Sequence, residues 1–247
     1  MNFFSLFKRK LIYNFKNKTS IDNDGNDKKT LDFLFHHYGS DKADIFKKKK
    51  NMGHGYSKFY EDKLKELKNK HINILEIGSF AGASAAAFTK YFSNANVFCF
   101  DINISNFDYI SKKIHVFGVD INNEKKVNKN LEKIFNDFHI KNFDIIIDDG
   151  SHNLSDILIG IKFFFKHVKP NGLYVIEDFK HPNYYEYNRN VNDVLIDQLL
   201  DGLKNKNIVK SNILSNNEQK ELINFIKKIE IFKGNLIDSD ISFITKS

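Results

Sequence analysis

The chain has 247 residues, which is the length of a single α/β domain with a short extension. Its hydrophobic content of 41% and charged content of 28% are those of a protein with a buried core, and they exclude an intrinsically disordered chain. The net charge of +7 favours anionic partners. The lysines are spread along the chain, however, and no RNA-binding or zinc-finger spacing accompanies them, so we expect no nucleic acid partner.

No apolar run approaches the ~18 residues that a membrane span needs, so we expect no transmembrane helix. The only cysteine, Cys99, cannot form an internal disulfide and is expected to be a small buried side chain. The N-terminus lacks the long apolar stretch of a signal peptide. These features are typical of a reducing compartment, and we expect a cytoplasmic location.

The first 29 residues are expected to form a basic extension and a linker. Residues 1–18 mix Phe and Leu with basic residues and are predicted to be helical, while residues 19–29 are polar and rich in turn formers. Such a helix could lie on an anionic membrane surface as a peripheral contact. We favour packing on the domain or on a partner subunit.

Residues 30–71 are expected to be a helical segment in front of the main domain. The stretch 30–38 is predicted to be a helix with Thr30 as its N-cap, and residues 56–69 repeat apolar side chains at helical spacing. A glycine-containing loop joins the two helices.

Residues 72–247 alternate short apolar strands with helices. Near-continuous apolar strands of this kind indicate a parallel sheet that is covered on both faces. We therefore expect an α/β fold with a doubly wound, mostly parallel, Rossmann-like sheet and an antiparallel hairpin at its C-terminal edge. The expected strands are 72–78, 96–102, 113–121, 143–150, 172–179, 229–237 and 241–246. The expected helices are 82–92, 123–137, 153–167, 191–204 and 216–228, with a turn at Pro170-Asn171-Gly172.

Three successive strands end near an acidic residue, at the edge where doubly wound sheets bind ligands. Glu76 precedes a loop with Gly78 and Gly82, and a carboxylate on the strand suits a ligand with a positive amine. Asp101 stands where it can accept both hydroxyls of a ribose, and Asp120 where it can reach an adenine amino group. Methyltransferases use this arrangement for S-adenosylmethionine. The loop does not read G-x-G-x-x-G, which argues against a nicotinamide-dependent oxidoreductase.

The fourth and fifth strands carry a denser group of acids. Asp148 and Asp149 end the fourth strand, Glu177 and Asp178 end the fifth, and neighbouring strands would gather these ends around one point. Carboxylates at close range repel unless a cation joins them, and oxygen ligands favour Mg²⁺, or alternatively Mn²⁺, over zinc. His152, three residues beyond Asp149, is a candidate general base beside the metal.

Six strings of residues together resemble a known family. They are YGSDK (38–42), HGYSKFYE (54–61), LEIGSFAGAS (75–84), FDIN (100–103), DIIIDDGSHN (144–153) and GLYVIEDF (172–179). With these strings the chain resembles the metal-dependent class I sugar O-methyltransferases of the macrocin and mycinamicin type, over roughly residues 36–181 and more loosely over the C-terminal strands. The strings IDDGSH and VIED are fairly specific to this family, whereas the glycine-rich loop is common to class I methyltransferases.

The resemblance implies a role for each matching position. It implies a metal site of Asp149, Glu177 and Asp178, with His152 and Asp149 as the catalytic residues. It implies a cofactor pocket of Glu76, Gly78, Ser79, Phe80, Ser84, Asp101, Ile102, Asp120 and Asp148. It makes residues 30–71 a lid, and the expected substrate contacts are Lys42, His54, Tyr56, Lys180 and His181.

Two departures from the family pattern bear on the expected pocket. Phe80 stands where many methyltransferases have Gly, so the loop takes a geometry of its own. The run Lys47–Lys50 lengthens the lid, so the substrate pocket is expected to differ from that of the family.

We therefore expect an S-adenosylmethionine- and Mg²⁺-dependent O-methyltransferase that methylates a sugar hydroxyl, with His152 as the base. The expected acceptor is a nucleotide-linked sugar or a surface-glycan precursor, as in capsule polysaccharide biosynthesis. The family tends to form homo-oligomers. A methyltransferase with a non-sugar small-molecule acceptor and a basic nucleic-acid-binding module remain the alternatives.

Overall fold

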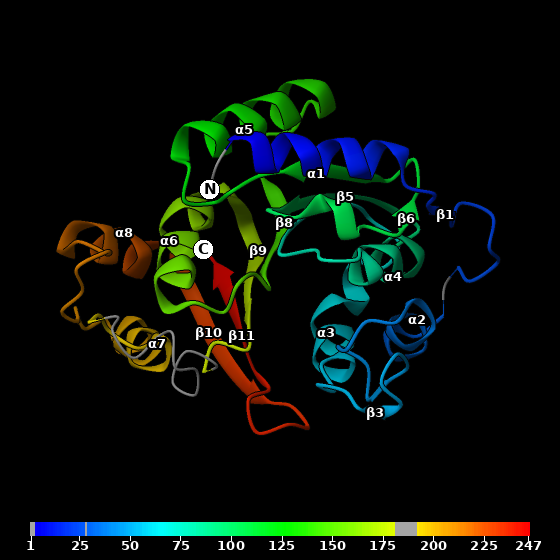
Figure 1. The fold of residues 1–247 in the computed structure, drawn as a ribbon. Helices are drawn as coiled ribbons and strands as arrows, with labels where there is room; N and C mark the ends of the chain where they lie inside the picture. The colour runs from blue at the N-terminus through cyan, green and yellow to red at the C-terminus, as the bar shows by residue number, and fades with distance from the viewer. Residues whose placement is uncertain (1–2, 28, 181–191) are drawn as a thin grey trace.

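The structure is a computed structural model, and it describes residues 3–27, 29–180 and 192–247. Its main strands are β4 (His71–Ile77), β5 (Asn94–Asp101), β7 (Ile114–Gly118), β8 (Phe143–Asp148), β9 (Val168–Glu177), β10 (Ile226–Lys233) and β11 (Asp240–Lys246). These seven strands form one sheet in the order β10-β11-β9-β8-β4-β5-β7 (Figure 1). The short strands β1 (Thr19–Ser20) and β6 (Tyr109–Ile110) form one pair, and β2 (Ile45–Phe46) and β3 (Asn51–Met52) form another.

Helices cover both faces of the sheet. The α-helices are α1 (Phe3–Phe15), α2 (Leu31–Tyr38), α3 (Ser57–Leu64), α4 (Ala83–Tyr91), α5 (Glu124–Phe138), α6 (Leu154–Phe164), α7 (Ile196–Lys204) and α8 (Asn216–Phe225). The 3₁₀-helices are η1 (Lys65–Leu67), η2 (Ile104–Asn106) and η3 (Phe165–His167). No helix among the described residues is long and apolar enough to cross a bilayer.

The sheet is doubly wound and mostly parallel, as the sequence predicts. β4 pairs in parallel with β5 on one side and with β8 on the other, so the strand order reverses between β4 and β8. β11 is antiparallel to both β9 and β10, which confirms the expected C-terminal hairpin. A crevice at the carboxyl ends of the strands is expected where the order reverses.

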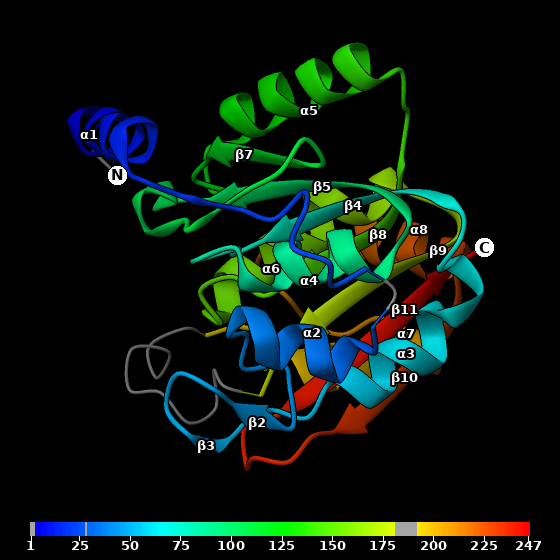
Figure 2. The same ribbon diagram turned by 90° about the vertical axis from the view of Figure 1, so that its right-hand side faces the viewer.

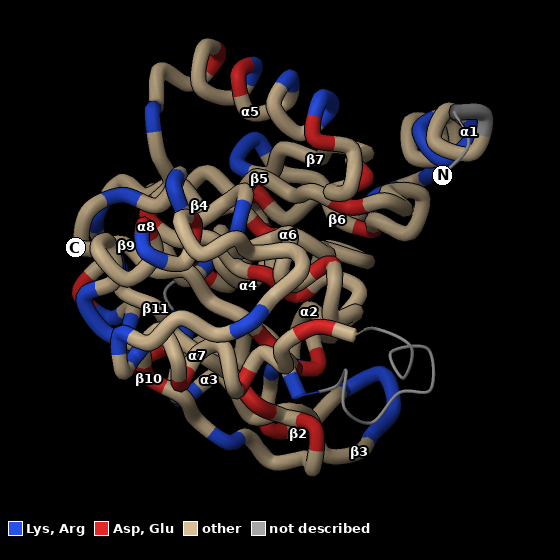
Figure 3. Tube along the Cα trace, turned by 90° about the vertical axis from the view of Figure 1, so that its left-hand side faces the viewer, with Lys and Arg blue, Asp and Glu red and all other residues tan. Residues whose placement is uncertain are grey.

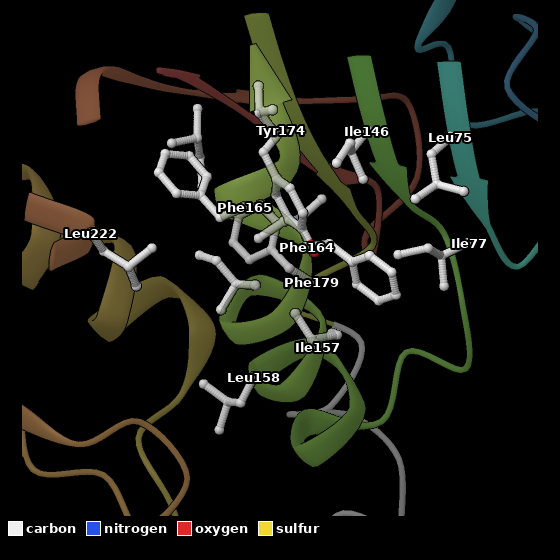
Figure 4. Packing of buried hydrophobic residues seen from close by; sticks show 14 of the residues in the cluster. Leu75, Ile77, Ile146, Ile157, Leu158, Phe164, Phe165, Tyr174, Phe179 and Leu222 are labelled. Atoms are coloured by element: carbon white, nitrogen blue, oxygen red, sulfur yellow. The ribbon is translucent and has the colours of Figure 1, made fainter. Parts of the chain in front are cut away.

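Two apolar layers enclose the sheet. Alternation along β4 sends Leu75 and Ile77 to one face and Ile72 and Ile74 to the other. The first face packs against α5, α6, α7 and α8, and the second packs against α2, α3 and α4 (Figure 2). Figure 4 shows the side chains of α6, among them Ile157, gathered beneath β8 and β9. Each fully buried side chain of this kind contributes about 1.5–3 kcal/mol to stability.

Helix α2 starts and stops where its capping residues predict. The side chain of Thr30 accepts a hydrogen bond from the backbone N–H of Phe33 at 3.3 Å, which confirms the expected N-cap. At the other end Gly39 takes a φ of 80° and closes the helix. The chain then turns back over the sheet with Lys42 buried beneath it.

The polar stretch 19–24 is attached to the domain. β1 pairs in parallel with β6, and the side chain of Ile21 is buried. Lys90 of α4 forms an ion pair with Asp24 at 3.0 Å.

Several expected boundaries are wrong, and the strand expected at 229–237 spans Ile226–Lys233. The predicted turn at 170–172 lies inside β9, where Asn171 takes a φ of 58° and the register with β8 is irregular. The predicted helix 216–228 ends at Phe225 because its last three residues join β10. The predicted helix 191–204 begins at Ile196 among the described residues.

Candidate functional site

A cavity of about 460 Å³ lies at the carboxyl ends of β4, β5, β7 and β8. Its volume is that of a small-molecule site. Residues 39–48 contribute one wall, with Lys42, Phe46 and Lys48; they belong to the segment 30–71, for which we keep the name lid. The expected cofactor residues that line it are Gly78, Ser79, Phe80, Ser84, Asp101, Ile102 and Asp120, and the expected catalytic residues Asp149 and His152 line it as well.

The loop after β4 depends on its two glycines. A Cβ at Gly78, whose φ is 86°, would lie 2.0 Å from the carbonyl oxygen of Asp149. A Cβ at Gly82, whose φ is 77°, would lie 2.3 Å from the ring of Phe107. Phe80 between them also takes a positive φ, 42°, and its side chain is 64% exposed. The loop therefore keeps a left-handed turn although Phe stands where the family pattern has Gly.

Glu76 is completely buried beside this cavity. Its Oε1 accepts a hydrogen bond from the hydroxyl of Ser84 at 2.5 Å, whereas its Oε2 has no hydrogen-bond partner among the described residues. Burial, opposed in part by Lys42, raises the pKa of Glu76 to about 7. A buried oxygen without a donor lowers the stability of the fold by about 1–3 kcal/mol. A ligand ammonium that donates to Oε2 would remove this cost.

Asp101 is held by backbone donors at the cavity wall. Its Oδ2 accepts a hydrogen bond from the N–H of Phe80 at 2.7 Å, and its Oδ1 accepts one from Asn103 at 2.5 Å. Burial raises the pKa of Asp101, although the two backbone hydrogen bonds and the charge of Arg9 lower it in part. An ionised carboxylate has about four acceptor positions, so Asp101 retains capacity for a ligand hydroxyl. Asp120 accepts a backbone hydrogen bond at 3.1 Å and faces the same cavity.

Acids at the ends of β8 and β9 lie close together. β8 and β9 are neighbours, and one ligand atom each of Asp149, His152 and Asp178 lies within 4.8 Å of the others. His152 Nε2 lies 3.8 Å from Asp149 Oδ1. His152 and Asp178 have φ values of 55° and 50°, which are strained for non-glycine residues and are typical of functional sites. The group suits a divalent cation.

Glu177 is not one of these three residues, and two buried donors hold its carboxylate. Lys42 Nζ lies 2.6 Å from Glu177 Oε2 and 2.5 Å from Asp149 Oδ2. The hydroxyl of Tyr60 donates to Glu177 Oε1 at 2.5 Å. Burial disfavours the Lys42 ammonium, but the two carboxylates outweigh burial and raise its pKa. An ammonium thus occupies the place of a cation between two of the expected metal ligands.

The lid residues His54 and Tyr56 contact Asp178 rather than line the cavity. His54 Nδ1 lies 3.2 Å from Asp178 Oδ1, and the hydroxyl of Tyr56 donates to the same oxygen. Burial opposes a charge on His54, but its hydrogen bond to Asp178 raises its pKa to about 9. Both side chains therefore orient Asp178, and its Oδ2 remains available for a ligand.

Two other expected residues do not line the cavity, and a third lies outside the described residues. The carboxylate of Asp148 accepts a hydrogen bond from Tyr174 at 3.3 Å within the first apolar layer, where burial raises its pKa to about 7. Lys180 forms an ion pair with Asp240 at 3.3 Å. His181 lies outside the described residues.

Two residues of the site were not predicted. Tyr60 follows Tyr56 by four residues, a spacing that places both hydroxyls on one face of a helix, so the sequence did contain that signal. Ser239, whose hydroxyl lies 2.8 Å from His54 Nδ1, is 185 residues away along the chain. No local pattern points to a contact at that separation.

Known proteins resemble this chain over part of its length. No family model matches the chain. Mycinamicin VI 2''-O-methyltransferase from Micromonospora griseorubida is 28% identical over 133 residues, which make up 51% of this chain and 31% of that protein. Demethylmacrocin O-methyltransferase from Streptomyces fradiae is 28% identical over 132 residues, with shares of 51% and 32%. The match thus spans about a third of the length of these relatives.

A solved structure covers more of the chain. The MycE methyltransferase of the mycinamycin pathway, in complex with Mg, SAH and mycinamycin VI, superposes with a TM-score of 0.66 and 21% identity over 90% of this chain and 56% of that chain. The fold is therefore the Rossmann-like fold of class I methyltransferases. The resemblance to the macrocin and mycinamicin sugar O-methyltransferases, expected from the sequence, is confirmed by these relatives.

Proposed function

We propose that the protein is an S-adenosylmethionine- and Mg²⁺-dependent O-methyltransferase that methylates a sugar hydroxyl, with His152 as the general base. The observation that carries the proposal is that two features lie next to one cavity. The first is the unsatisfied buried oxygen of Glu76, whose hydrogen-bond partner Ser84 lines the cavity. The second is the cation-binding group of Asp149, His152 and Asp178, of which Asp149 and His152 line the cavity. The named activities of the relatives, and the Mg and SAH bound by MycE, support it.

Three strand-end acids would hold the cofactor. Glu76 would accept a hydrogen bond from the cofactor ammonium at Oε2, the oxygen that lacks a donor. Asp101 would accept the ribose hydroxyls, and Asp120 would accept from the adenine amino group. When bound, S-adenosylmethionine supplies a methyl group on a sulfonium, which is already a good leaving group. The chain then has to hold the acceptor oxygen close and remove its proton.

The proposed metal ligands are Asp149, Glu177 and Asp178. Oxygen donors suit Mg²⁺ or Mn²⁺. The position of the Lys42 ammonium supports the assignment, since Asp149 and Glu177 already hold one positive charge between them. When bound, the ion supplies Lewis acidity that lowers the pKa of a coordinated hydroxyl.

His152 would take the proton of the acceptor hydroxyl at a ring nitrogen. Its position at the cavity wall and next to Asp149 supports this role, because the carboxylate stabilises the imidazolium that forms. Asp178 would be kept in place by His54 and Tyr56, which both contact its Oδ1.

For the acceptor we propose a nucleotide-linked sugar or a surface-glycan precursor, as in capsule polysaccharide biosynthesis. Lys48 in the lid wall of the cavity and the net charge of +7 support an acceptor that carries phosphate. Nucleotide-linked sugars and a lone buried cysteine both suit the cytoplasm. The expected homo-oligomer stays a prediction.

A methyl-transfer assay tests the proposed chemistry. The purified protein is incubated with S-adenosylmethionine and a panel of nucleotide-linked sugars, and methylated products are detected by mass spectrometry. EDTA is expected to abolish turnover and added Mg²⁺ to restore it. His152→Ala is expected to lose roughly 10²–10⁴-fold in turnover, the usual contribution of a general base, while it keeps its affinity for S-adenosylhomocysteine.

Three results would each contradict one part of the proposal. Full activity in EDTA would remove the metal from the mechanism. Intact turnover of His152→Ala would remove the base. If only non-sugar acceptors were methylated, the protein would still be a methyltransferase, but the proposed sugar acceptor would be wrong.

A further inference from the structure

Helix α1 packs against the domain through its polar side. The guanidinium of Arg9 donates to the backbone carbonyl of Ile102 at 2.8 Å, and Lys16 forms an ion pair with Asp108 at 2.6 Å. The ring of Tyr13 meets the edge of Phe107 with 6.3 Å between the ring centroids. These contacts determine which side of α1 faces the domain.

The apolar side of α1 points to solvent as a result. Phe7, Leu11 and Phe15 follow one another at intervals of four residues, and Ile12 lies beside them. Their exposed fractions are 53%, 41%, 84% and 45% for Phe7, Leu11, Phe15 and Ile12. We call these four side chains the α1 apolar face. Among the described residues none covers this face, although the helix itself is held against the domain.

Positive charge surrounds the α1 apolar face. Lys8 and Lys10 are exposed on the same helix. The sequence has no Asp or Glu before Asp22. Figure 3 shows basic but no acidic positions along α1, whereas α5 carries both basic and acidic positions. A face that joins exposed aromatic and aliphatic side chains to lysines complements an anionic lipid surface.

The area of this face argues against a second copy of the chain as its occupant. A helix of 13 residues is about 20 Å long and about 10 Å wide, so one face offers on the order of 200 Å². A stable protein interface needs about 800 Å² from each partner. Two such helices would also bring their lysines together. A bilayer has neither restriction, because it is continuous and carries the opposite charge.

We propose that α1 is an interfacial helix that docks the protein on an anionic lipid bilayer through Phe7, Leu11, Ile12 and Phe15, with Lys8 and Lys10 at the headgroups. This docking is independent of the proposed methyltransferase activity. Arg9 ties the helix to Ile102, which lines the cavity, so a bilayer bound to α1 lies near the strand ends that form the site.

A tryptophan introduced into the full chain tests the docking. The natural sequence has no Trp, so Phe15→Trp supplies a single fluorophore on the α1 apolar face. Its emission is expected to shift to shorter wavelength with vesicles of phosphatidylcholine and phosphatidylglycerol, but not with phosphatidylcholine alone. Phe225→Trp is the matched control, because Phe225 is 52% exposed at the end of α8. Its emission should not move with either vesicle.

Charge reversal tests the electrostatic part by co-sedimentation with the same vesicles. Each lysine near an anionic surface is worth about fivefold in affinity, so Lys8→Glu with Lys10→Glu should weaken binding at least ~25-fold. Lys204→Glu with Lys220→Glu, on α7 and α8, is the control with equal net charge and should bind anionic vesicles with a loss of less than about fivefold.

Three outcomes would overturn the proposal. One is no binding to anionic vesicles, and another is an equal loss in both double variants. The third is a dimer in light scattering that Phe7→Ser with Phe15→Ser dissociates while vesicles bind neither form, because a second copy would then occupy the face. Binding of S-adenosylhomocysteine is measured in every variant, so failure of the docking is distinguishable from failure of the proposed function.

Discussion

At the scale of the residue, Glu76 combines complete burial with one oxygen that no described donor reaches. Two features of the sequence produce this state. Glu76 is the penultimate residue of β4, between the buried apolar side chains of Leu75 and Ile77, and Ser84 supplies a donor to one oxygen only. Such a carboxylate lowers the stability of the ligand-free protein and gains most from a cationic ligand group.

Glu76→Gln keeps the shape of the side chain and removes its charge. We expect the affinity for S-adenosylhomocysteine, measured by calorimetry, to fall roughly 10- to 100-fold, because a hydrogen bond between charged groups contributes about 1.5–3 kcal/mol. Asp148→Asn is the matched control, since Asp148 is equally enclosed on the opposite face of the sheet. A loss as large in the control would contradict a specific role for Glu76.

The raised pKa of Glu76 adds a pH dependence. The pKa is about 7 in the folded protein and 4.5 in the reference state, so folding retains a proton that the unfolded chain has released. The ligand-free protein is therefore expected to lose stability as the pH rises from 4.5 towards 7. Affinity for the cofactor amine should rise as the pH passes through about 7, where the carboxylate forms. Glu76→Gln should lose the dependence of affinity and should show a smaller loss of stability with pH, because Asp148, whose pKa burial also raises to about 7, keeps its own contribution.

Lys42 joins the lid to the acids of the sheet. Lys42→Met leaves Asp149 and Glu177 without their shared counter-charge, and removal of one partner from a buried ion pair costs about 3–5 kcal/mol. We expect urea denaturation to show a loss of this size without divalent metal and a smaller loss with Mg²⁺ or Mn²⁺. An equal loss in both conditions would mean that the metal does not replace the ammonium at these carboxylates.

At the scale of the element, the C-terminal hairpin supports the lid. The N–H of Asn235, in the turn between β10 and β11, donates to the carbonyl oxygen of His54 at 2.9 Å. Ser239 contacts the same histidine through its side chain. A hairpin far along the chain thus places a residue that contacts Asp178.

Gly234→Ala tests this support. An added Cβ would lie 2.2 Å from the carbonyl oxygen of His54, so either the hairpin turn or the lid must move. We expect thermal denaturation to show a destabilisation of about 1–3 kcal/mol, as for overpacking elsewhere. Gly118→Ala in β7, where the nearest atom would lie 3.4 Å away, should cost less than about 1 kcal/mol. Equal effects at the two glycines would contradict a tight contact between hairpin and lid.

Much of the fold could be predicted from the sequence, but some contacts of the site could not. The five parallel strands were predictable because each is a short apolar run between polar segments, and the acids at their ends followed from strand direction alone. The turn expected at 170–172 was wrong because Pro and Gly also occur at strand irregularities, and β9 absorbs them with a positive φ at Asn171. The roles of Lys42 and Ser239 depend on contacts more than 100 residues apart, which no local pattern encodes.

At the scale of the whole molecule, three distant parts of the chain converge on the cavity and its acids. The parallel strands supply Glu76, Asp101 and Asp149, the lid supplies Lys42, and the hairpin fixes the lid from the other side. Helix α1 is attached next to Ile102, on the same edge of the sheet. The proposed cofactor pocket, the cation-binding group and helix α1 thus lie around one edge of the sheet.

Calorimetric titration of the purified protein with S-adenosylhomocysteine, with and without Mg²⁺, tests the central claim most directly. A methyltransferase with the proposed pocket should bind with micromolar affinity and one site per chain, and its affinity should fall in Glu76→Gln. The absence of binding in both conditions would contradict the assignment of the strand-end acids to this cofactor and, with it, the proposed function.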